Sequence, residues 1–399
     1  MASASPNDRE AAADWLEQLQ ARVYAGLGIE PEQQAEFDEA ELRRILKQTH
    51  LRDVTANLNL SEDEYVELLV DNRRRILAQL PTRFEDPDYY MLISGIAEDI
   101  EKTLQDNGRT LPLNPLFGTL PTGRVNGFAA AVPNSQYRVI MLEDGMFGFA
   151  NLMCKAVAMS FPEIESEKEG GLRFSTDPDD VKKMLRDKPE IARRFLDAVS
   201  AYLVHGHPHH AQPYAAPRGA MYVGSILRDS METFVVGHEY GHVVAGHLGA
   251  ATSRCAMVAD VDVETISTDW MQEFEADALG LESMLGVRQA AGYDLAMSFW
   301  GADAFFGCID VVERAISILE YGEERPWVAD THPPTKERRR FQREMIKLSL
   351  PNEPAVDRAL DLAAHLETAI DSLWAMVRPA FLAMHRDGLR PTAGWRAVA

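Results

Sequence analysis

The most informative stretch of this chain, residues 231–247, reads Met231-Glu-Thr-Phe-Val-Val-Gly-His-Glu-Tyr-Gly-His-Val-Val-Ala-Gly-His247. Its apolar pattern predicts a buried helix that is carried by Phe234, Val235, Val236, Val243 and Val244. On a helix, His238 and His242 are one turn apart, so both imidazoles project from one face and can bind the same metal ion. Glu239 can reach a water molecule beside such an ion without being a ligand itself. The alternative is a buried, hydrogen-bonded cluster that contains no metal.

A catalytic zinc ion takes three protein ligands and keeps one position for water, so a third ligand must come from another element. His247 follows His242 by five residues, which turns it away from the ligand face of a continuing helix, and we interpret it as structural. Glu273 and Asp277 are four residues apart and share one helical face among apolar neighbours, which favours a buried site over a solvated acidic surface. We therefore predict that Glu273 is the third ligand of one zinc ion. Asp277 is predicted to hydrogen-bond a ligating imidazole.

Four motifs follow one another in an order that is known from one family of metallopeptidases. They are Asn126-Gly-Phe-Ala129, His238-Glu-Tyr-Gly-His242, Glu273-Phe-Glu-Ala-Asp277, and Thr331-His-Pro-Pro334 with Arg338 after it. This set resembles the gluzincin zinc metallopeptidases, in particular the group that contains the prenyl-protein and heat-shock membrane proteases and their soluble relatives. The resemblance covers roughly residues 90–345. The chain departs from the membrane members because it lacks their spans, and it carries a long insertion at about residues 160–228.

The resemblance implies a zincin-like catalytic core and a role for each motif. Glu239 is then the general base, and His332 is the candidate that stabilises the oxyanion, since the equivalent histidine of the family faces the cleft. The first motif is similar to the strand that precedes the active-site helix. That strand either has a free edge that pairs with an extended peptide or belongs to an ordinary core hairpin. The candidate substrate-binding residues are Asn126, Gly127, Phe128 and Ala129.

Hydrophobic periodicity predicts a mainly helical chain of the α+β class with a small antiparallel sheet. Helices are expected at about residues 11–25, 61–80, 87–105, 147–159, 177–186, 190–204, 231–248, 268–285, 289–321 and 353–386. Two extended runs, 125–132 and 137–142, flank turn residues and predict a hairpin, whereas 111–123 is typical of a connector and 162–176 of a loop. We expect a helical extension at 1–85, a zincin-like metallopeptidase domain at 86–350 that includes the insertion, and a C-terminal helix at 351–399.

The composition narrows the range of partners. A formal net charge of −22 over 399 residues repels phosphate backbones, so no nucleic-acid partner is expected. No run reaches the roughly 18–20 uncharged apolar residues that a membrane span requires, and the first ten residues do not resemble a secretory signal. Three widely spaced cysteines, Cys154, Cys255 and Cys308, indicate buried reduced thiols. We therefore expect a cytoplasmic protein.

Together these patterns predict a zinc-dependent peptidase that hydrolyses cytoplasmic peptides or proteins. An endopeptidase is the first hypothesis, and the sequence leaves endo- versus exopeptidase action open. The alternative is a non-catalytic or latent zinc domain that acts as a regulatory or partner-binding module. Glu239 favours catalysis, because a structural zinc site normally closes its fourth ligand position. A second histidine-rich stretch, His205 to His210, is interpreted as a solvated loop, with a second metal site as its alternative. The sequence leaves the substrate and the oligomeric state open, and the ligand types do not exclude manganese or cobalt.

Overall fold

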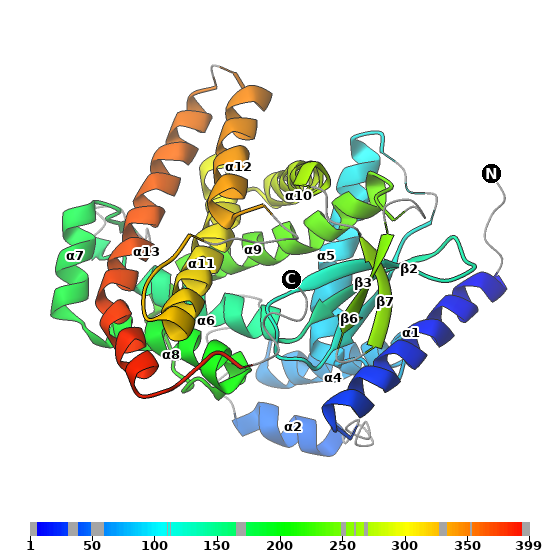
Figure 1. The fold of residues 1–399 in the computed structure, drawn as a ribbon. Helices are drawn as coiled ribbons and strands as arrows, with labels where there is room; N and C mark the ends of the chain where they lie inside the picture. The colour runs from blue at the N-terminus through cyan, green and yellow to red at the C-terminus, as the bar shows by residue number, and fades with distance from the viewer. Residues whose placement is uncertain are drawn as a thin grey trace.

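The computed structural model describes residues 6–30, 39–48, 60–109, 111, 113–164, 173–248, 253–258, 261–266, 270–326, 333–351 and 353–392. The chain is mainly helical, with a small sheet at one side of the helical body (Figure 1). The predicted mainly helical chain of the α+β class is therefore confirmed.

Before the sheet, the described residues form α1 (Pro6–Leu27), α2 (Glu39–Gln48), α4 (Glu62–Leu77) and α5 (Pro87–Asp106). A capping box precedes α4, because the Ser61 hydroxyl accepts the Glu64 N–H at 3.2 Å and the Glu64 carboxylate accepts the Ser61 N–H at 2.8 Å. α5 begins with Pro87, which has no N–H to leave unsatisfied. α2 was not predicted, although Leu42, Ile45 and Leu46 have helical spacing, because the segment is short and rich in charged residues.

The described sheet has five strands in the order β1-β3-β2-β7-β6. Their bounds are β1 (Leu116–Leu120), β2 (Gly127–Ala131), β3 (Arg138–Glu143), β6 (Ser253–Val258) and β7 (Val261–Ile266). The predicted hairpin is confirmed, since β2 runs antiparallel to β3 with Ala129 opposite Ile140. β1 instead runs parallel to β3, with Leu116 opposite Val139. The expectation of a purely antiparallel sheet is wrong, and the sheet is mixed.

Several strands form where the sequence predicted none. Prolines on either side of β1 favour a connector, yet all five residues of β1 are buried, so tertiary packing outweighs the local turn chemistry. The β6–β7 hairpin was also missed, although valine alternates with acidic residues from Val261. The predicted loop at 162–176 contains a short antiparallel pair, β4 (Glu163–Ile164) and β5 (Arg173–Phe174).

Helices cover both faces of the sheet. α1 lies along one face (Figure 1), where Leu16 and Leu19 pack against Leu120, Phe128 and Met141. The opposite face belongs to the main core, which the sheet shares with α5, α6 and α9. The segment expected as an N-terminal extension therefore contributes a layer to the packing of the sheet.

A buried polar cluster fixes α1 to β1. The carboxylate of Glu85 accepts a hydrogen bond from Gln20 Nε2 at 2.7 Å and another from the Thr119 N–H at 2.8 Å. The Thr119 hydroxyl donates a third at 2.8 Å. Because buried polar groups are costly unless they are paired, this cluster specifies one position of α1 on the sheet.

The helical body contains α6 (Gly145–Met159), α7 (Pro178–Asp187), α8 (Glu190–His205), the 3-10 helix η1 (Pro208–His210), α9 (Arg218–Val244), α10 (Trp270–Ala290), α11 (Leu295–Tyr321), α12 (Thr335–Ser349) and α13 (Pro354–Arg386). α9 begins well before the predicted start at Met231, because its earlier turns also bury apolar residues such as Val223 and Leu227. α12 was not predicted, since most of its residues are charged or polar. α13 packs along α11 (Figure 1).

α11 is the single helix in the described ranges that is long and apolar enough to cross a membrane. However, 83% of its most apolar window is buried inside the structure. Its buried Asp303 pairs with two arginines of α12, Arg339 and Arg343, whose Nε atoms lie 3.1 and 2.8 Å from Asp303 Oδ1. These ion pairs fix α12 against α11. The expected absence of a membrane span remains a prediction.

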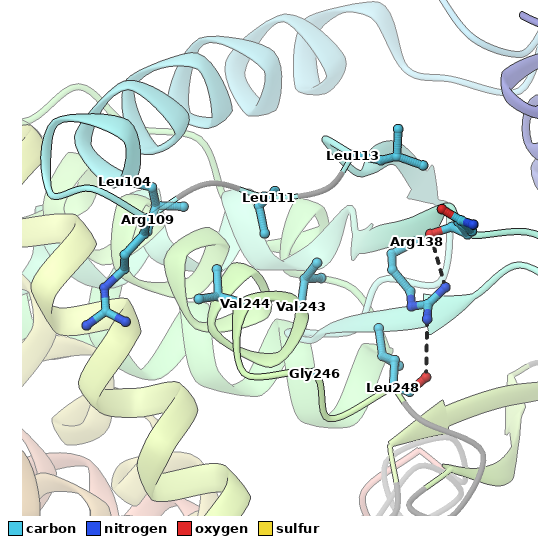
Figure 2. Close-up of a pocket in the computed structure, with 10 residues that line it drawn as sticks. Leu104, Arg109, Leu111, Leu113, Arg138, Val243, Val244, Gly246 and Leu248 are labelled. Atoms are coloured by element: carbon cyan, nitrogen blue, oxygen red, sulfur yellow. Dashed lines mark hydrogen bonds between the residues drawn. The ribbon is translucent and has the colours of Figure 1, made fainter. Parts of the chain in front are cut away.

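A pocket of about 320 Å³ lies beside the C-terminal end of α9 (Figure 2). It forms where the connection from α5 to β1 and the start of β3 meet the last turn of α9. It is lined by Leu104, Arg109, Leu111, Leu113, Gln136, Arg138, Val243, Val244, Gly246 and Leu248.

Glu232, buried on α9, predicts an unusual dependence of stability on pH. Burial raises the pKa of Glu232 to about 8, although Arg228 opposes the shift. A carboxyl with a raised folded-state pKa contributes stability that is fully present below its ordinary pKa of 4.5 and is lost as the pH rises through about 8. We therefore expect Glu232→Gln to stabilise the chain at pH 8.5, by up to about 5 kcal/mol, and to leave its stability nearly unchanged at pH 4.

Thermal unfolding followed by circular dichroism at both pH values checks this prediction. Glu190→Gln, which removes an exposed carboxyl, is the control for the loss of one negative charge. An equal change of stability at both pH values for Glu232→Gln contradicts the prediction.

Candidate metal centre

Small residues bring α9 and α10 into close contact. A Cβ on Gly241 would lie 2.8 Å from the carbonyl oxygen of Ala276, and a Cβ on Gly280 would lie 2.8 Å from the backbone nitrogen of His238. Gly237, one turn before Gly241, also faces α10. Because no side chain separates the two backbones here, side chains on either side of the crossing can meet.

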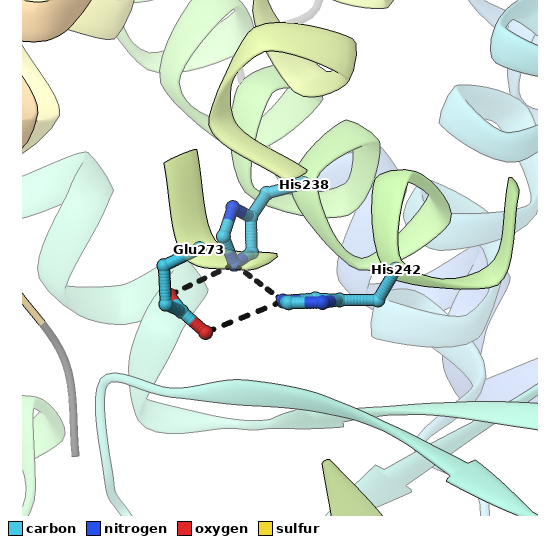
Figure 3. Close-up of side chains that lie close together, drawn as sticks. All are labelled: His238, His242 and Glu273. Carbon is cyan, nitrogen blue, oxygen red and sulfur yellow. Dashed lines mark hydrogen bonds and ion pairs between the residues drawn. The ribbon is translucent and has the colours of Figure 1, made fainter. Parts of the chain in front are cut away.

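His238 and His242 of α9 converge with Glu273 of α10 (Figure 3). The two Nε2 atoms are 3.1 Å apart, and the Glu273 carboxylate oxygens lie 3.7 Å from His238 Nε2 and 3.5 Å from His242 Nε2. Ligand atoms around a tetrahedral zinc ion are separated by roughly 3.3 Å. All three side chains are buried. The residues that the sequence predicted as ligands thus form one cluster that can hold a single metal ion.

The outer hydrogen bond of His238 shows which nitrogen faces the cluster. His238 Nδ1 lies 2.9 Å from Asp277 Oδ1, and because a carboxylate only accepts, Nδ1 carries the hydrogen. The lone pair of His238 Nε2 then points toward His242 and Glu273. Lone pairs and carboxylate oxygens at these distances repel one another unless a cation lies among them, so this donor set fits a metal ion.

His247 orients the second imidazole, a role that the sequence analysis missed. Its Nε2 donates to Glu275 Oε2 at 3.2 Å, and its Nδ1 lies 2.8 Å from His242 Nδ1. A neutral His247 that donates from Nε2 must accept at Nδ1, so His242 donates from Nδ1 and keeps its Nε2 for a metal. His247 reaches this place because α9 ends at Val244 and Gly246 adopts a φ of 73°. Gly246 was the residue from which this helix end, and so the new direction of the chain at His247, could have been predicted.

Arg338 of α12 completes the surroundings of Asp277. Its Nε and Nη2 donate to the two Asp277 oxygens at 2.8 and 2.6 Å, and its Nη1 lies 3.5 Å from Glu273 Oε2. Although burial raises the pKa of Asp277, the Arg338 guanidinium and the His238 hydrogen bond leave it below its ordinary value. Asp277 is therefore an ionised group at the place where the sequence predicts a partner for a ligating imidazole.

Glu239 lies beside β2 rather than among the ligand atoms. The Ala129 backbone N–H hydrogen-bonds its carboxylate, and a Cβ on Gly127 would lie 3.5 Å from its Cγ. Burial raises the pKa of Glu239 to about 7, and His238 opposes this shift. A carboxyl with a pKa near neutrality can both take up and release a proton, which is what a general base requires.

β2 is not the free edge strand that one of the two interpretations suggested. It lies between β3 and β7, and its register with β7 places Ala130 opposite Thr265. The segment Gly127–Ala129 lies outside that register and beside Glu239. Any backbone pairing with a peptide is therefore restricted to this short segment.

The four predicted substrate-binding residues do not all face the metal cluster. Ala129 belongs to the core that contains α9, whereas the side chain of Phe128 packs under α1 on the opposite face of the sheet. The carbonyl oxygen of Asn126 accepts a hydrogen bond from the Glu143 N–H at 3.0 Å. The sequence motif therefore contributes backbone near the site, and not the phenyl ring.

His332 and Thr331 lie outside the described residues, so the assignment of an oxyanion donor stays a prediction. The interpretation of the histidine-rich stretch as a loop is wrong, since it spans the end of α8 and η1, and His207 Nε2 lies 3.0 Å from Asp144 Oδ2. Where side chains are described, the cluster with metal-ligand geometry consists of His238, His242 and Glu273. The second metal site is therefore not supported.

Comparisons with known proteins identified no relative of this chain. No family model, no curated protein and no solved structure matches it. The resemblance to the gluzincins therefore rests on the motifs and their order.

Proposed function

We propose that this chain is a zinc-dependent peptidase with a zincin-like core, which hydrolyses peptide bonds in cytoplasmic peptides or proteins. The observation that carries the proposal is the position of Glu239 beside three buried donor residues. Two imidazoles and a carboxylate suit zinc, and three protein ligands leave one position of a tetrahedral ion open. A purely structural zinc site normally closes that position and has no use for a neighbouring carboxylate.

The residues of the metal cluster and its neighbours have separate roles in the proposed reaction. His238, His242 and Glu273 would hold the zinc ion, which lowers the pKa of water and polarises a carbonyl group when it is bound. Glu239 accepts the proton of the attacking water and returns it to the leaving amine. Asp277 and His247 act as positioning residues, because each fixes the tautomer of one ligating imidazole.

Substrate binding rests on β2 and on the segment before α12. The backbone of Gly127–Ala129 lies beside Glu239 and can align an extended peptide by hydrogen bonds that do not depend on its sequence. His332 is the proposed donor to the developing oxyanion. Such backbone recognition favours an endopeptidase.

A second candidate function, a latent or regulatory form of the same zinc domain, is favoured by the burial of the site. His238, Glu239, His242 and Glu273 are only 8, 5, 2 and 1% exposed. A peptide that reaches Glu239 must displace part of the surrounding structure. In that case the chain binds zinc, and it cleaves substrate only after a trigger loosens this cover.

We expect the full chain with one equivalent of zinc to cleave fluorescently labelled casein, to lose this activity with a strong chelator, and to regain it with added zinc. Metal analysis beside the cleavage assay checks the result. Cleavage that appears only in low, non-denaturing urea supports the latent form. A chain that binds zinc but cleaves nothing under either condition contradicts the peptidase, and a chain that binds no zinc contradicts both candidates.

A further inference from the structure

The pocket beside the end of α9 is lined by both apolar and positively charged side chains. Leucine and valine side chains form its walls, and Figure 2 shows Arg109 and Arg138 at its two ends with Leu111 between them. Its volume of about 320 Å³ is within the range of small-molecule sites. Apolar walls with a few fixed polar groups are typical of such sites.

The two arginines differ in their partners. Arg109 Nη2 lies 3.1 Å from Glu282 Oε2, so its charge is balanced within the chain. Arg138 donates only to backbone carbonyls, those of Gln136, Tyr137 and Leu248. No carboxylate of the described residues lies within ion-pair distance of Arg138. In a chain with a net charge of −22, a guanidinium without an acidic partner at an apolar pocket is an available site for an anion.

The residues around Arg138 also determine which kind of anion fits the pocket and how it is oriented. Arg109 is already paired with Glu282, and the surface beside it carries Glu98 and Glu101 with a single Lys102, so an anion is attracted to Arg138 rather than to that end. A phosphate group usually gathers several cationic or N–H donors, whereas a single guanidinium matches one carboxylate. The side chains of Leu104, Leu111 and Leu113 then offer contact to a hydrocarbon tail.

We propose that this pocket binds a medium-chain fatty acid, with the carboxylate on Arg138 and the tail along Leu111 and Val244. The pocket is coupled to the metal centre, because Gly246 and Leu248 line it and flank His247, which hydrogen-bonds the ligating His242. A ligand that shifts this turn changes the position of His247 and with it the affinity of the cluster for zinc. The pocket is thus an effector site, separate from the place where a peptide would be cleaved.

Binding is tested by calorimetric titration of the metal-free full chain with octanoate and with octanamide, its neutral isostere. The metal-free chain prevents octanoate from binding a zinc ion. We expect octanoate to bind about tenfold or more tightly than octanamide, because only the former makes a charged hydrogen bond. Comparable affinities for the two probes, or no binding of octanoate, overturn the proposal, and this comparison needs no variant.

Two matched variants locate the site. Arg138→Gln is expected to weaken octanoate binding about tenfold and to leave octanamide binding unchanged, whereas Arg109→Gln, at the paired arginine, changes octanoate binding less than about twofold. Equal effects of the two variants place the anion elsewhere and overturn the assignment. Both variants are compared with the unmodified chain by circular dichroism, so that a loss of folding is recognised.

Coupling is tested by competition for zinc with a chromogenic chelator in the presence and absence of saturating octanoate. We expect the zinc affinity to change about fivefold, and linkage requires zinc to change the octanoate affinity by the same factor. The effect should disappear in Arg138→Gln, which also separates it from octanoate that binds zinc directly. An unchanged zinc affinity overturns the coupling. Neither measurement depends on peptidase activity, so failure of the proposed function leaves this result interpretable.

Discussion

Glu239→Gln is expected to lower the rate of peptide cleavage by roughly 10²–10⁴-fold while the chain still binds one zinc ion. The amide has nearly the same shape as the carboxyl and can occupy the same place beside β2. It cannot accept a proton, however, so the attacking water is not activated. Zinc binding persists because the three donor atoms belong to other residues, His238, His242 and Glu273.

Single-turnover cleavage of labelled casein and metal analysis of the same sample measure the two quantities separately. If the intact chain proves latent, both measurements are made in the urea concentration that releases activity. Glu190→Gln is the control for the loss of one carboxylate, since Glu190 is an exposed residue of α8 and does not belong to the metal cluster. Activity of Glu239→Gln within tenfold of the native chain contradicts the assigned general base, and so does a loss of zinc from this variant.

The metal donors could be predicted from the sequence because their placement is mostly local. Two histidines one turn apart on a buried helix must face the same way, and Glu273 is related to Asp277 by the same spacing on a second helix. The glycines at 237, 241 and 280 determine how closely the two helices approach. Their spacing can be read from the sequence, but the packing of α9 against α10 depends on tertiary contacts and could not be predicted from it.

The features that escaped prediction depend on contacts between distant segments. β1 is a strand because α1 and β3 bury it, and its local sequence favours a turn. His247 acts on His242 because the helix ends just before it, and the position of a helix end is weakly encoded. Arg338 reaches Asp277 because buried ion pairs to Asp303 fix α12, whose own sequence contains few apolar residues.

Gly280→Ala is expected to destabilise the chain by about 2 kcal/mol, although the same change stabilises most helices. Alanine normally stabilises a helix interior by about 1 kcal/mol relative to glycine, because it restricts the unfolded chain. Here the added Cβ would lie 2.8 Å from the His238 backbone nitrogen and 3.0 Å from its Cα, and backbone atoms cannot rotate away. α10 must therefore move away from α9, which separates Glu273 from the two imidazoles.

We expect this displacement to lower the zinc affinity roughly 10–100-fold, as changes in the support of metal ligands do. Competition with a chromogenic chelator measures the affinity, and urea unfolding of the metal-free chain measures stability. Gly95→Ala is the matched control, because Gly95 lies in α5 with no atom within 4 Å of its added Cβ, so it should gain stability and keep its zinc affinity. If the Gly280 and Gly95 variants behave alike, the close contact of α9 and α10 is not what places Glu273 opposite the two histidines.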